Sequence, residues 1–202
     1  MRLFIAIDIP EEIRDRMSRF IDGVRELAPD ANWVRPESFH VTLKFLGETP
    51  PERLDELKRE LTGVAGKPST IRFGGLGFFP TPRLARVFWA GMQADLRLGE
   101  LAGAVDEAAA RLGFERERYR YTPHLTLARA GARSSGSPSG KGSSLAPRFR
   151  RLEEKLSALG YLGAEESKPD FGTMTAREFC LFESRLSPHG ARYTKLAVFP
   201  LE

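Results

Sequence analysis

The apolar residues of the chain recur in two different periods, which together predict a mixture of strands and helices. Short runs rich in β-branched and aromatic residues are typical of strands, and apolar residues spaced three and four apart are typical of helices. The expected strands and short extended pieces are 2–8, 32–34, 38–46, 71–73, 78–79, 86–91, 121–128, 176–186 and 191–199. The expected helices are 10–27, 51–61, 96–112 and 149–159.

The order of these elements favours an α+β fold with antiparallel sheets. It runs β-α-β-α-β-β and then α-β-loop-α-β-β, and its mixed connections and terminal hairpin argue against a doubly wound parallel sheet. Residues 131–147 are rich in Gly, Ser and Pro with few apolar groups, so we expect a flexible loop there. The length of 202 residues suits one domain, or two small lobes around a shared system of sheets.

Composition and charge place the chain among ordinary globular proteins. It is 41% hydrophobic and 29% charged with a net charge of +4, and arginine clusters such as Arg116, Arg118 and Arg120 make a phosphate-bearing partner plausible. Its one cysteine, Cys180, excludes an intramolecular disulfide, and we expect a buried thiol because the surrounding residues predict a strand. No apolar run is long enough to span a membrane, and the first residues read as a strand, so we expect a cytoplasmic protein.

Two of the three histidines occupy the same short motif, His-x-Thr followed by an apolar residue. His40 and Thr42 belong to the first copy, and His124 and Thr126 belong to the second. Side chains two apart on a strand share a face and lie about 6.5–7 Å apart along the chain. A pair of such units can place two proton-transfer groups and two hydroxyl donors around one small anion. The alternative is a pair of half-buried strand histidines that have no part in any chemistry.

Segments from nearly the whole chain resemble those of a known family. They are MRLFIAIDIP, WVRPESFHVTLKFLGE, GLGFFPTPRLARVFWAG, YTPHLTLAR and FESRLSPHGARYTKLAVFPL. Together with the paired motifs, they resemble the two-histidine phosphoesterase superfamily, and more narrowly the RNA 2′,3′-cyclic phosphodiesterases, also called 2′-5′ RNA ligases. The chain departs from the family at 131–147, where the loop after the second motif is longer than we expect.

The resemblance implies a single domain over residues 1–202, with two lobes related by a pseudo-twofold axis around a positively charged central groove. It implies an enzyme that hydrolyses the 2′,3′-cyclic phosphate ends of RNA to 2′-phosphomonoesters, with RNA as its partner and without a metal or other cofactor. We also expect a monomer. The residues also argue against a metal site, since no cysteine pattern or Glu-x-x-His surrounds the motif histidines. A zinc site that combines these histidines with a remote carboxylate is the open alternative.

The resemblance also implies roles at the site. It makes His40 the acid that protonates the leaving O3′ and His124 the base that activates water, whereas the residues alone leave the reverse assignment equally open. Two imidazoles of ordinary pKa can hold these opposite protonation states near neutral pH. Thr42 and Thr126 would donate hydroxyl hydrogen bonds to the non-bridging phosphate oxygens. Their presence is otherwise explained by the strand propensity of threonine alone.

Two further residues follow the motif threonines by three positions, where a regular strand turns a side chain to the opposite face. The resemblance places a phosphate-binding arginine at Arg129, which requires that the strand end or bulge, as 130–131 permits. Phe45 meets the same objection, so we expect it in the core, with base stacking as the alternative. His189 lies in a predicted turn at 187–190, and we assign it no catalytic role.

The sequence leaves other functions open. The same site run in reverse would join a cyclic phosphate end to a 5′-hydroxyl and give a 2′-5′ linkage. A related enzyme would cleave 2′-5′ oligoadenylate or other cyclic nucleotides with the same two histidines. A non-catalytic module that binds RNA ends or nucleotides would explain the basic balance of the chain, but not the intact His and Thr of both motifs.

Overall fold

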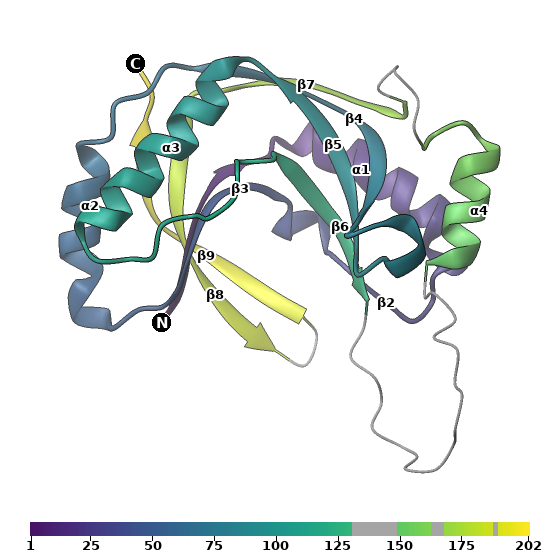
Figure 1. Ribbon diagram of the computed structural model, residues 1–202, viewed down its shortest axis with the longest axis horizontal. Coiled ribbons are helices and arrows are strands. Elements are labelled where there is room, and N and C mark those ends of the chain that lie inside the picture. The colour runs from purple at the N-terminus through teal and green to yellow at the C-terminus, as the bar shows by residue number, and fades with distance from the viewer. Residues whose placement is uncertain (131–148, 163–167, 188–189) are drawn as a thin grey trace, which may run out of the picture.

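The computed structural model describes residues 1–130, 149–162, 168–187 and 190–202, which form two antiparallel sheets flanked by helices (Figure 1). One sheet has the strand order β3-β1-β8-β9, and the other has the order β2-β6-β5-β4-β7. The strands are β1 (Arg2–Asp8), β2 (Ala31–Trp33), β3 (His40–Glu48), β4 (Ser69–Phe79), β5 (Val87–Ala94), β6 (His124–Ala130), β7 (Asp170–Ala176), β8 (Glu178–Ser187) and β9 (Gly190–Pro200). The helices are α1 (Glu11–Val24), α2 (Leu54–Thr62), α3 (Leu96–Arg111) and α4 (Arg150–Ala158), with 3-10 turns η1 (Arg25–Leu27), η2 (Pro36–Ser38), η3 (Pro51–Arg53) and η4 (Pro82–Leu84).

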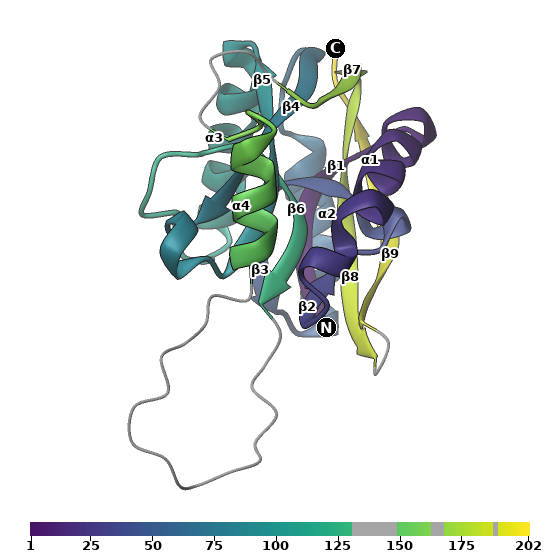
Figure 2. The same ribbon diagram turned by 90° about the vertical axis from the view of Figure 1, so that its right-hand side faces the viewer.

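The two halves of the chain repeat one plan, which confirms the expected α+β fold with two related lobes. β1 pairs with β3 and β8, and β5 pairs in the same way with β6 and β4. The helices cross between the lobes: α1 follows β1 but contacts β7, whereas α3 follows β5 but contacts β3. α1 and α4 lie close together in Figure 1, and the turned view of Figure 2 separates them. Each lobe therefore buries its apolar surface with the help of a helix from the other half.

Strand β1 is buried on both faces of the four-stranded sheet. Leu3, Ile5 and Ile7 on one face belong to the main core. Side chains of the opposite face form a second, smaller cluster, which consists of Phe4, Ala6, Cys180 and Phe182. The expected burial of the Cys180 thiol is confirmed, and burial raises its pKa to about 11. A thiol with this pKa is protonated and inert near neutral pH.

The glycine-rich segment 74–77 lies inside the continuous strand β4, whereas the sequence predicts a bend between two short strands. A Cβ atom on Gly77 would lie 2.2 Å from the side chain of Trp89 on β5. A Cβ atom on Gly91 would lie 2.8 Å from the carbonyl oxygen of Gly74. These glycines therefore allow β4 and β5 to approach each other closely, and they do not end the strand.

Strand β7 has no counterpart among the predicted elements. Its residues, DFGTMTA, bury only Phe171 and Ala176 fully, so the pattern of apolar positions is weak. It forms a strand because its backbone pairs with β4 from Ser69 to Gly74. Pairing with a distant part of the chain thus overrides the local pattern.

Two expectations fall on parts of the chain that the structure does not describe. The flexible loop expected at 131–147 lies outside the described residues, and so does His189 in the predicted turn. Among the described helices, none is both long enough and apolar enough to cross a membrane.

A buried ion pair joins the first motif strand to α3. Lys44 of β3 is 1% exposed, and its Nζ donates to Asp106 Oδ1 at 2.6 Å and to the carbonyl oxygen of Glu115 at 2.8 Å. Because a buried ammonium group without its counter-charge is costly, we expect Asp106→Ala to lower the free energy of unfolding by about 3 kcal/mol. Urea denaturation measures this change. The exposed Asp22 of α1 supplies the control, since Asp22→Ala should cost less than about 0.5 kcal/mol. Equal losses in the two variants would contradict the role of the pair.

Candidate active site

The first motif lies on β3 with its side chains on one face of the four-stranded sheet. His40, Thr42 and Phe45 stand opposite positions 8, 6 and 4 of β1. These positions of β1 are two apart, so their partners on β3 also share one face. Regular alternation would turn Phe45 to the other side. A β-bulge at Leu43 adds one residue to β3 after Thr42 and restores Phe45 to the face of the motif.

The second motif on β6 repeats this arrangement, bulge included. His124, Thr126 and Arg129 stand opposite positions 91, 89 and 87 of β5. The extra residue here is Leu127, so the bulge that Arg129 requires lies before it and not at 130–131. Arg129 and Phe45 therefore occupy equivalent places in the two lobes, each on the face of its own motif.

The expectation that Phe45 lies in the core is wrong. Its side chain is 59% exposed, whereas Leu43 and Lys44, the two residues before it, are both buried. Two adjacent buried residues are the mark of the bulge, because both turn away from the motif face. The bulge is not visible in the sequence, where Phe45 simply has the wrong parity for the motif face.

Each motif histidine is oriented by the carbonyl oxygen two residues before it. Nδ1 of His40 lies 2.7 Å from the carbonyl oxygen of Ser38, and Nδ1 of His124 lies 2.9 Å from that of Thr122. Because a carbonyl oxygen only accepts hydrogen bonds, Nδ1 carries the proton and donates it in both cases. Nε2 of each neutral imidazole is therefore the nitrogen that can accept a proton from a substrate or a water molecule.

His40 lies among aromatic rings, and its pKa is affected by a positively charged residue of the other lobe. Its ring centroid lies 4.8 Å from that of Phe4 and 5.1 Å from that of Tyr193. The pKa of His40 is lowered to about 4, chiefly by burial; the hydrogen bond to the Ser38 carbonyl opposes this change, and the positive charge of Arg129 adds to it. Arg129 belongs to the second motif strand, so this effect indicates that the two motifs lie near each other.

Tyr121 ties the two motifs together. Its hydroxyl donates to the carbonyl oxygen of Thr42 at 3.0 Å, and the next residue, Thr122, orients His124. Burial raises the pKa of Tyr121, so the hydroxyl keeps the proton that it donates. The strands β3 and β6 also contact each other directly. The motif pattern does not single out Tyr121. Its position, three residues before His124, is the feature of the sequence that could have drawn attention to it.

A second chain of hydrogen bonds holds the turn that orients His40. Arg14 of α1 donates from Nη1 to the carbonyl oxygen of Pro36, at the start of η2, at 3.0 Å. Arg14 also pairs with Asp8, which stands opposite His40 on β1. The turn that ends with the Ser38 carbonyl is thus tied to both α1 and β1.

Comparison with known proteins places the chain in a family. A family model described as LigT-like phosphoesterase matches residues 7–89. An RNA 2′,3′-cyclic phosphodiesterase from Archaeoglobus fulgidus is 32% identical over 199 residues, which cover 98% of this chain and 99% of that protein. The chain belongs to the LigT-like phosphoesterase family. A second RNA 2′,3′-cyclic phosphodiesterase, from Methanothermobacter thermautotrophicus, is 33% identical to this phosphoesterase, with 100% of this chain and 99% of that protein covered.

Solved structures agree with this assignment. The crystal structure of E. coli LigT complexed with 3′-AMP matches the phosphoesterase with a TM-score of 0.71 at 27% identity, and covers 99% of this chain and 97% of its own. The crystal structure of a protein from Thermus thermophilus matches with a TM-score of 0.73 at 27% identity, and covers 100% and 98%. The phosphoesterase is therefore an enzyme of the phosphodiesterase class, and a non-catalytic binding module is not supported.

The low pKa of His40 predicts how the stability of this phosphoesterase depends on pH. An ordinary histidine in the unfolded chain has a pKa near 6.5, whereas that of His40 in the folded protein is about 4. Between these values the unfolded chain binds a proton that the folded protein does not bind. The contribution of His40 to the free energy of unfolding is therefore fully present above pH 6.5 and is lost as the pH falls toward 4. We expect His40 to account for a loss of about 3 kcal/mol over this range.

Urea denaturation near pH 7 and near pH 4 tests this expectation with the wild-type protein and His40→Gln. Other groups titrate in both proteins, so the difference between the two losses isolates His40. If the variant loses as much stability as the wild type, His40 is not the source of the dependence.

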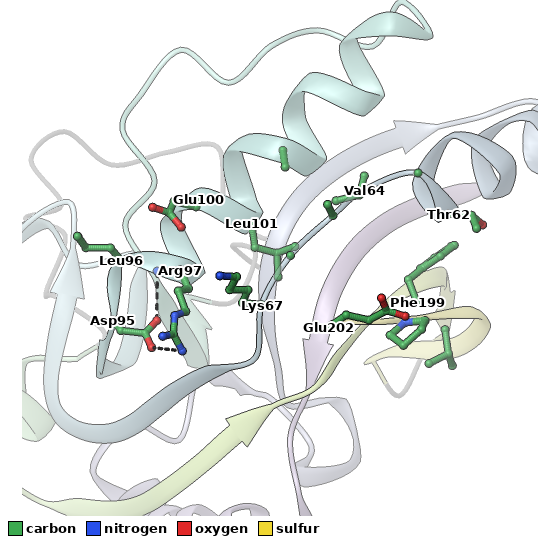
Figure 3. Close-up of a pocket in the computed structure, with 16 residues that line it drawn as sticks. Thr62, Val64, Lys67, Asp95, Leu96, Arg97, Glu100, Leu101, Phe199 and Glu202 are labelled. Carbon is green, nitrogen blue, oxygen red and sulfur yellow. Dashed lines mark hydrogen bonds and ion pairs between the residues drawn. The ribbon is translucent and has the colours of Figure 1, made fainter.

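An open hollow of about 1160 Å³ lies between the end of α2, the start of α3 and the end of β9 (Figure 3). Among the described residues, its lining falls within 62–67, 95–104 and 198–202, so neither motif strand contributes to it. The charged side chains that line it carry both signs and are Lys67, Asp95, Arg97, Glu100 and Glu202. Because positive charge is not in excess there, the motif strands suit a phosphate ester better than this hollow does.

Proposed function

We propose that this chain hydrolyses the 2′,3′-cyclic phosphate at the end of an RNA to a 2′-phosphomonoester. Water attacks phosphorus, the bond between phosphorus and O3′ breaks, and O3′ leaves with a proton. His124 takes a proton from the attacking water, and His40 gives a proton to O3′. No metal takes part in this scheme, and residues 1–202 act as one domain in which each lobe supplies one motif.

The paired motifs carry this proposal. Each motif strand presents an imidazole and a threonine hydroxyl on one face, and β6 adds the guanidinium of Arg129. Hydroxyl groups and a guanidinium are suited to the non-bridging oxygens of a phosphodiester, where negative charge grows in the transition state. Two relatives that match almost the full chain are RNA 2′,3′-cyclic phosphodiesterases, which supports the same substrate here.

The low pKa of His40 bears on which histidine is the acid. At neutral pH the free protein holds His40 as a neutral imidazole, which suits a base and opposes the donor role. The donor role therefore requires that the negative charge of the substrate raise the pKa of His40, as a nearby opposite charge does. We expect this pKa to rise by at least about one unit when a 2′-nucleotide binds.

An NMR titration of the histidine rings, with and without adenosine 2′-monophosphate, measures the pKa of His40 in both states. His124→Gln and His40→Gln assign the two signals. If the pKa of His40 stays near 4 in the complex, the roles are reversed, and His40 is the base while His124 is the donor.

The direct test is to incubate the purified protein with an oligonucleotide that ends in a 2′,3′-cyclic phosphate. We expect a 2′-phosphate end, identified by chromatography against synthetic 2′- and 3′-phosphate standards, and no effect of EDTA on the rate. Activity that is lost with EDTA and restored by zinc would replace this scheme with a metal site. Faster cleavage of 2′-5′ oligoadenylate or of small cyclic nucleotides would change the substrate and keep the two histidines.

The same scheme includes weak ligation. If the 5′-hydroxyl of a second RNA attacks phosphorus in place of water, the bond between phosphorus and O3′ breaks in the same way, and the product is a 2′-5′ linkage. Water is far more abundant than RNA ends, so joining should be a minor reaction and should not depend on ATP. Efficient joining that requires ATP would contradict this part of the proposal.

A further inference from the structure

The segment between α3 and β6 is held against the first motif strand near both of its ends. Close to its start, the carbonyl oxygen of Glu115 accepts a hydrogen bond from Lys44 Nζ of β3 at 2.8 Å. Close to its end, the hydroxyl of Tyr121 donates to the carbonyl oxygen of Thr42 at 3.0 Å. The segment therefore passes β3, the outermost strand of its sheet, on its way from α3 to β6 (Figure 1). It lies where the two lobes and their motif strands meet.

The arginine cluster of this segment divides into paired and unpaired members. Arg116 donates two hydrogen bonds to the carboxylate of Glu107 on α3, at 2.7 and 2.8 Å, and Arg118 pairs with Glu115 at 2.6 Å. Arg120 is exposed, and no carboxylate among the described residues forms an ion pair with it. Its guanidinium is therefore available to a phosphate group, which it can bind through several N–H donors.

An exposed aromatic ring stands next to Arg120 in the chain. Tyr119 is 87% exposed, although the backbone on both sides of it is held, by Tyr121 and by the hydrogen bond from the Glu117 N–H to Asp106 Oδ1 at 3.1 Å. Even a fully extended chain keeps the Cα of Tyr119 within about 7 Å of that of Tyr121 and about 18 Å of that of His124. An aromatic ring and a guanidinium on a held segment are the groups that bind single-stranded RNA, by base stacking and by phosphate contact.

We propose that Tyr119 and Arg120 bind the single-stranded RNA that precedes the terminal nucleotide, with one base stacked on the ring and one phosphate on the guanidinium. The cyclic phosphate belongs to the last nucleotide, so the rest of the RNA chain has to leave the motif strands across a border such as this segment. The enzyme then favours the end of an RNA chain over a mononucleotide with the same cyclic phosphate. This proposal rests on the proposed function and names the part of the substrate that lies beyond the reacting nucleotide.

The first test compares two substrates with the same reacting nucleotide. One is adenosine 2′,3′-cyclic phosphate, and the other is a short oligoadenylate that ends in it. For Tyr119→Ala we expect kcat/KM to fall roughly 5- to 100-fold on the oligonucleotide and to change less than about twofold on the mononucleotide. Tyr119→Phe, which keeps the ring, should behave as the wild type with both. The matched control is Leu96→Ala, since Leu96 is 83% exposed and lines the hollow to which neither motif strand contributes. It should change neither value.

The second test isolates the charge of Arg120. Fluorescence anisotropy measures the affinity for an oligoadenylate that ends in a 2′-phosphate, at several salt concentrations. The slope of the logarithm of the affinity against that of the salt concentration should be shallower by about 0.7 in Arg120→Ala, because one phosphate contact is lost. Arg120→Lys keeps the charge and should restore the slope. Arg59→Ala, which removes an exposed arginine of α2, is the control and should keep the slope of the wild type.

The outcomes separate this proposal from the proposed function. An equal fall of activity with both substrates in Tyr119→Ala would overturn the RNA contact, because the segment would then support the motifs or the fold. Unchanged activity and affinity of both alanine variants with the oligonucleotide would also overturn it, and would leave this surface to a protein partner. If the wild type cleaves neither substrate, the proposed function fails and the affinities decide alone. A weaker affinity of Tyr119→Ala for the oligonucleotide then supports the contact, and equal affinities reject it.

Discussion

His40→Ala and His124→Ala are each expected to lower kcat/KM on an RNA 2′,3′-cyclic phosphate end by about 10²- to 10⁴-fold. Each variant removes one of the two proton-transfer groups and leaves the threonine hydroxyls in place. Initial rates of cleavage of the oligonucleotide measure the loss. The third histidine supplies the matched control: His189→Ala should lose little activity, because no catalytic role is assigned to it.

The double variant and the pH profile separate the chemistry from any effect on folding. In the proposed scheme the two histidines act in one reaction, so removing both should cost little more activity than removing one. The pH–rate profile of the wild type should be bell-shaped, and each single variant should lose the limb that its own histidine produces. Circular dichroism shows whether each variant is folded. Full activity in either folded variant would refute the proposed chemistry.

The second large effect concerns the threonine hydroxyls. Thr42→Val and Thr126→Val should each lower kcat by about 10²- to 10³-fold, since each removes one donor aimed at the charge that develops on the phosphate oxygens. Valine keeps the β-branched shape that suits a strand, so the substitution removes little besides the hydroxyl. Thr175→Val on β7, where the threonine is exposed, is the matched control and should leave kcat unchanged.

The split between kcat and KM decides what the hydroxyls do. A rise in KM with kcat unchanged would mean that they bind the substrate and the transition state equally. Unchanged rates in both variants would show that Thr42 and Thr126 serve only their strands, which is the alternative that the sequence leaves open.

The fold class and the strands that carry the motifs were predictable because they depend on local pattern. The β-branched residues around His40 and His124 are typical of half-buried strands, and both strands are present. Strand β7 could not be predicted, since its weak pattern becomes a strand only by pairing with β4. The glycines of β4 predict a bend, whereas the strand is continuous there. They are needed because Trp89, on the neighbouring strand β5, lies too close to Gly77 for a side chain, and the local sequence does not reveal this contact.

The positions of Phe45 and Arg129 cannot be predicted from the pattern of their own strands. Strict alternation places each of them on the wrong face of its strand, and both are returned to the motif face by a bulge. A bulge is defined by the register against a neighbouring strand, here β1 or β5, and these neighbours are far away in the chain. The pattern of the motif strand by itself therefore assigns Phe45 to the core, which the structure contradicts.

The groups of the proposed chemistry can be identified from the sequence alone: two imidazoles and two hydroxyls, at a spacing that places them on one face of any strand. Local propensity and residue type are enough to identify these groups, and the family resemblance also follows from the sequence. The place where these groups meet comes from folding. The hydrogen bond from Tyr121 to the Thr42 carbonyl and the effect of Arg129 on His40 join residues of opposite lobes. Such contacts depend on how two sheets pack and on which strands pair, and neither is a property of any short stretch of sequence.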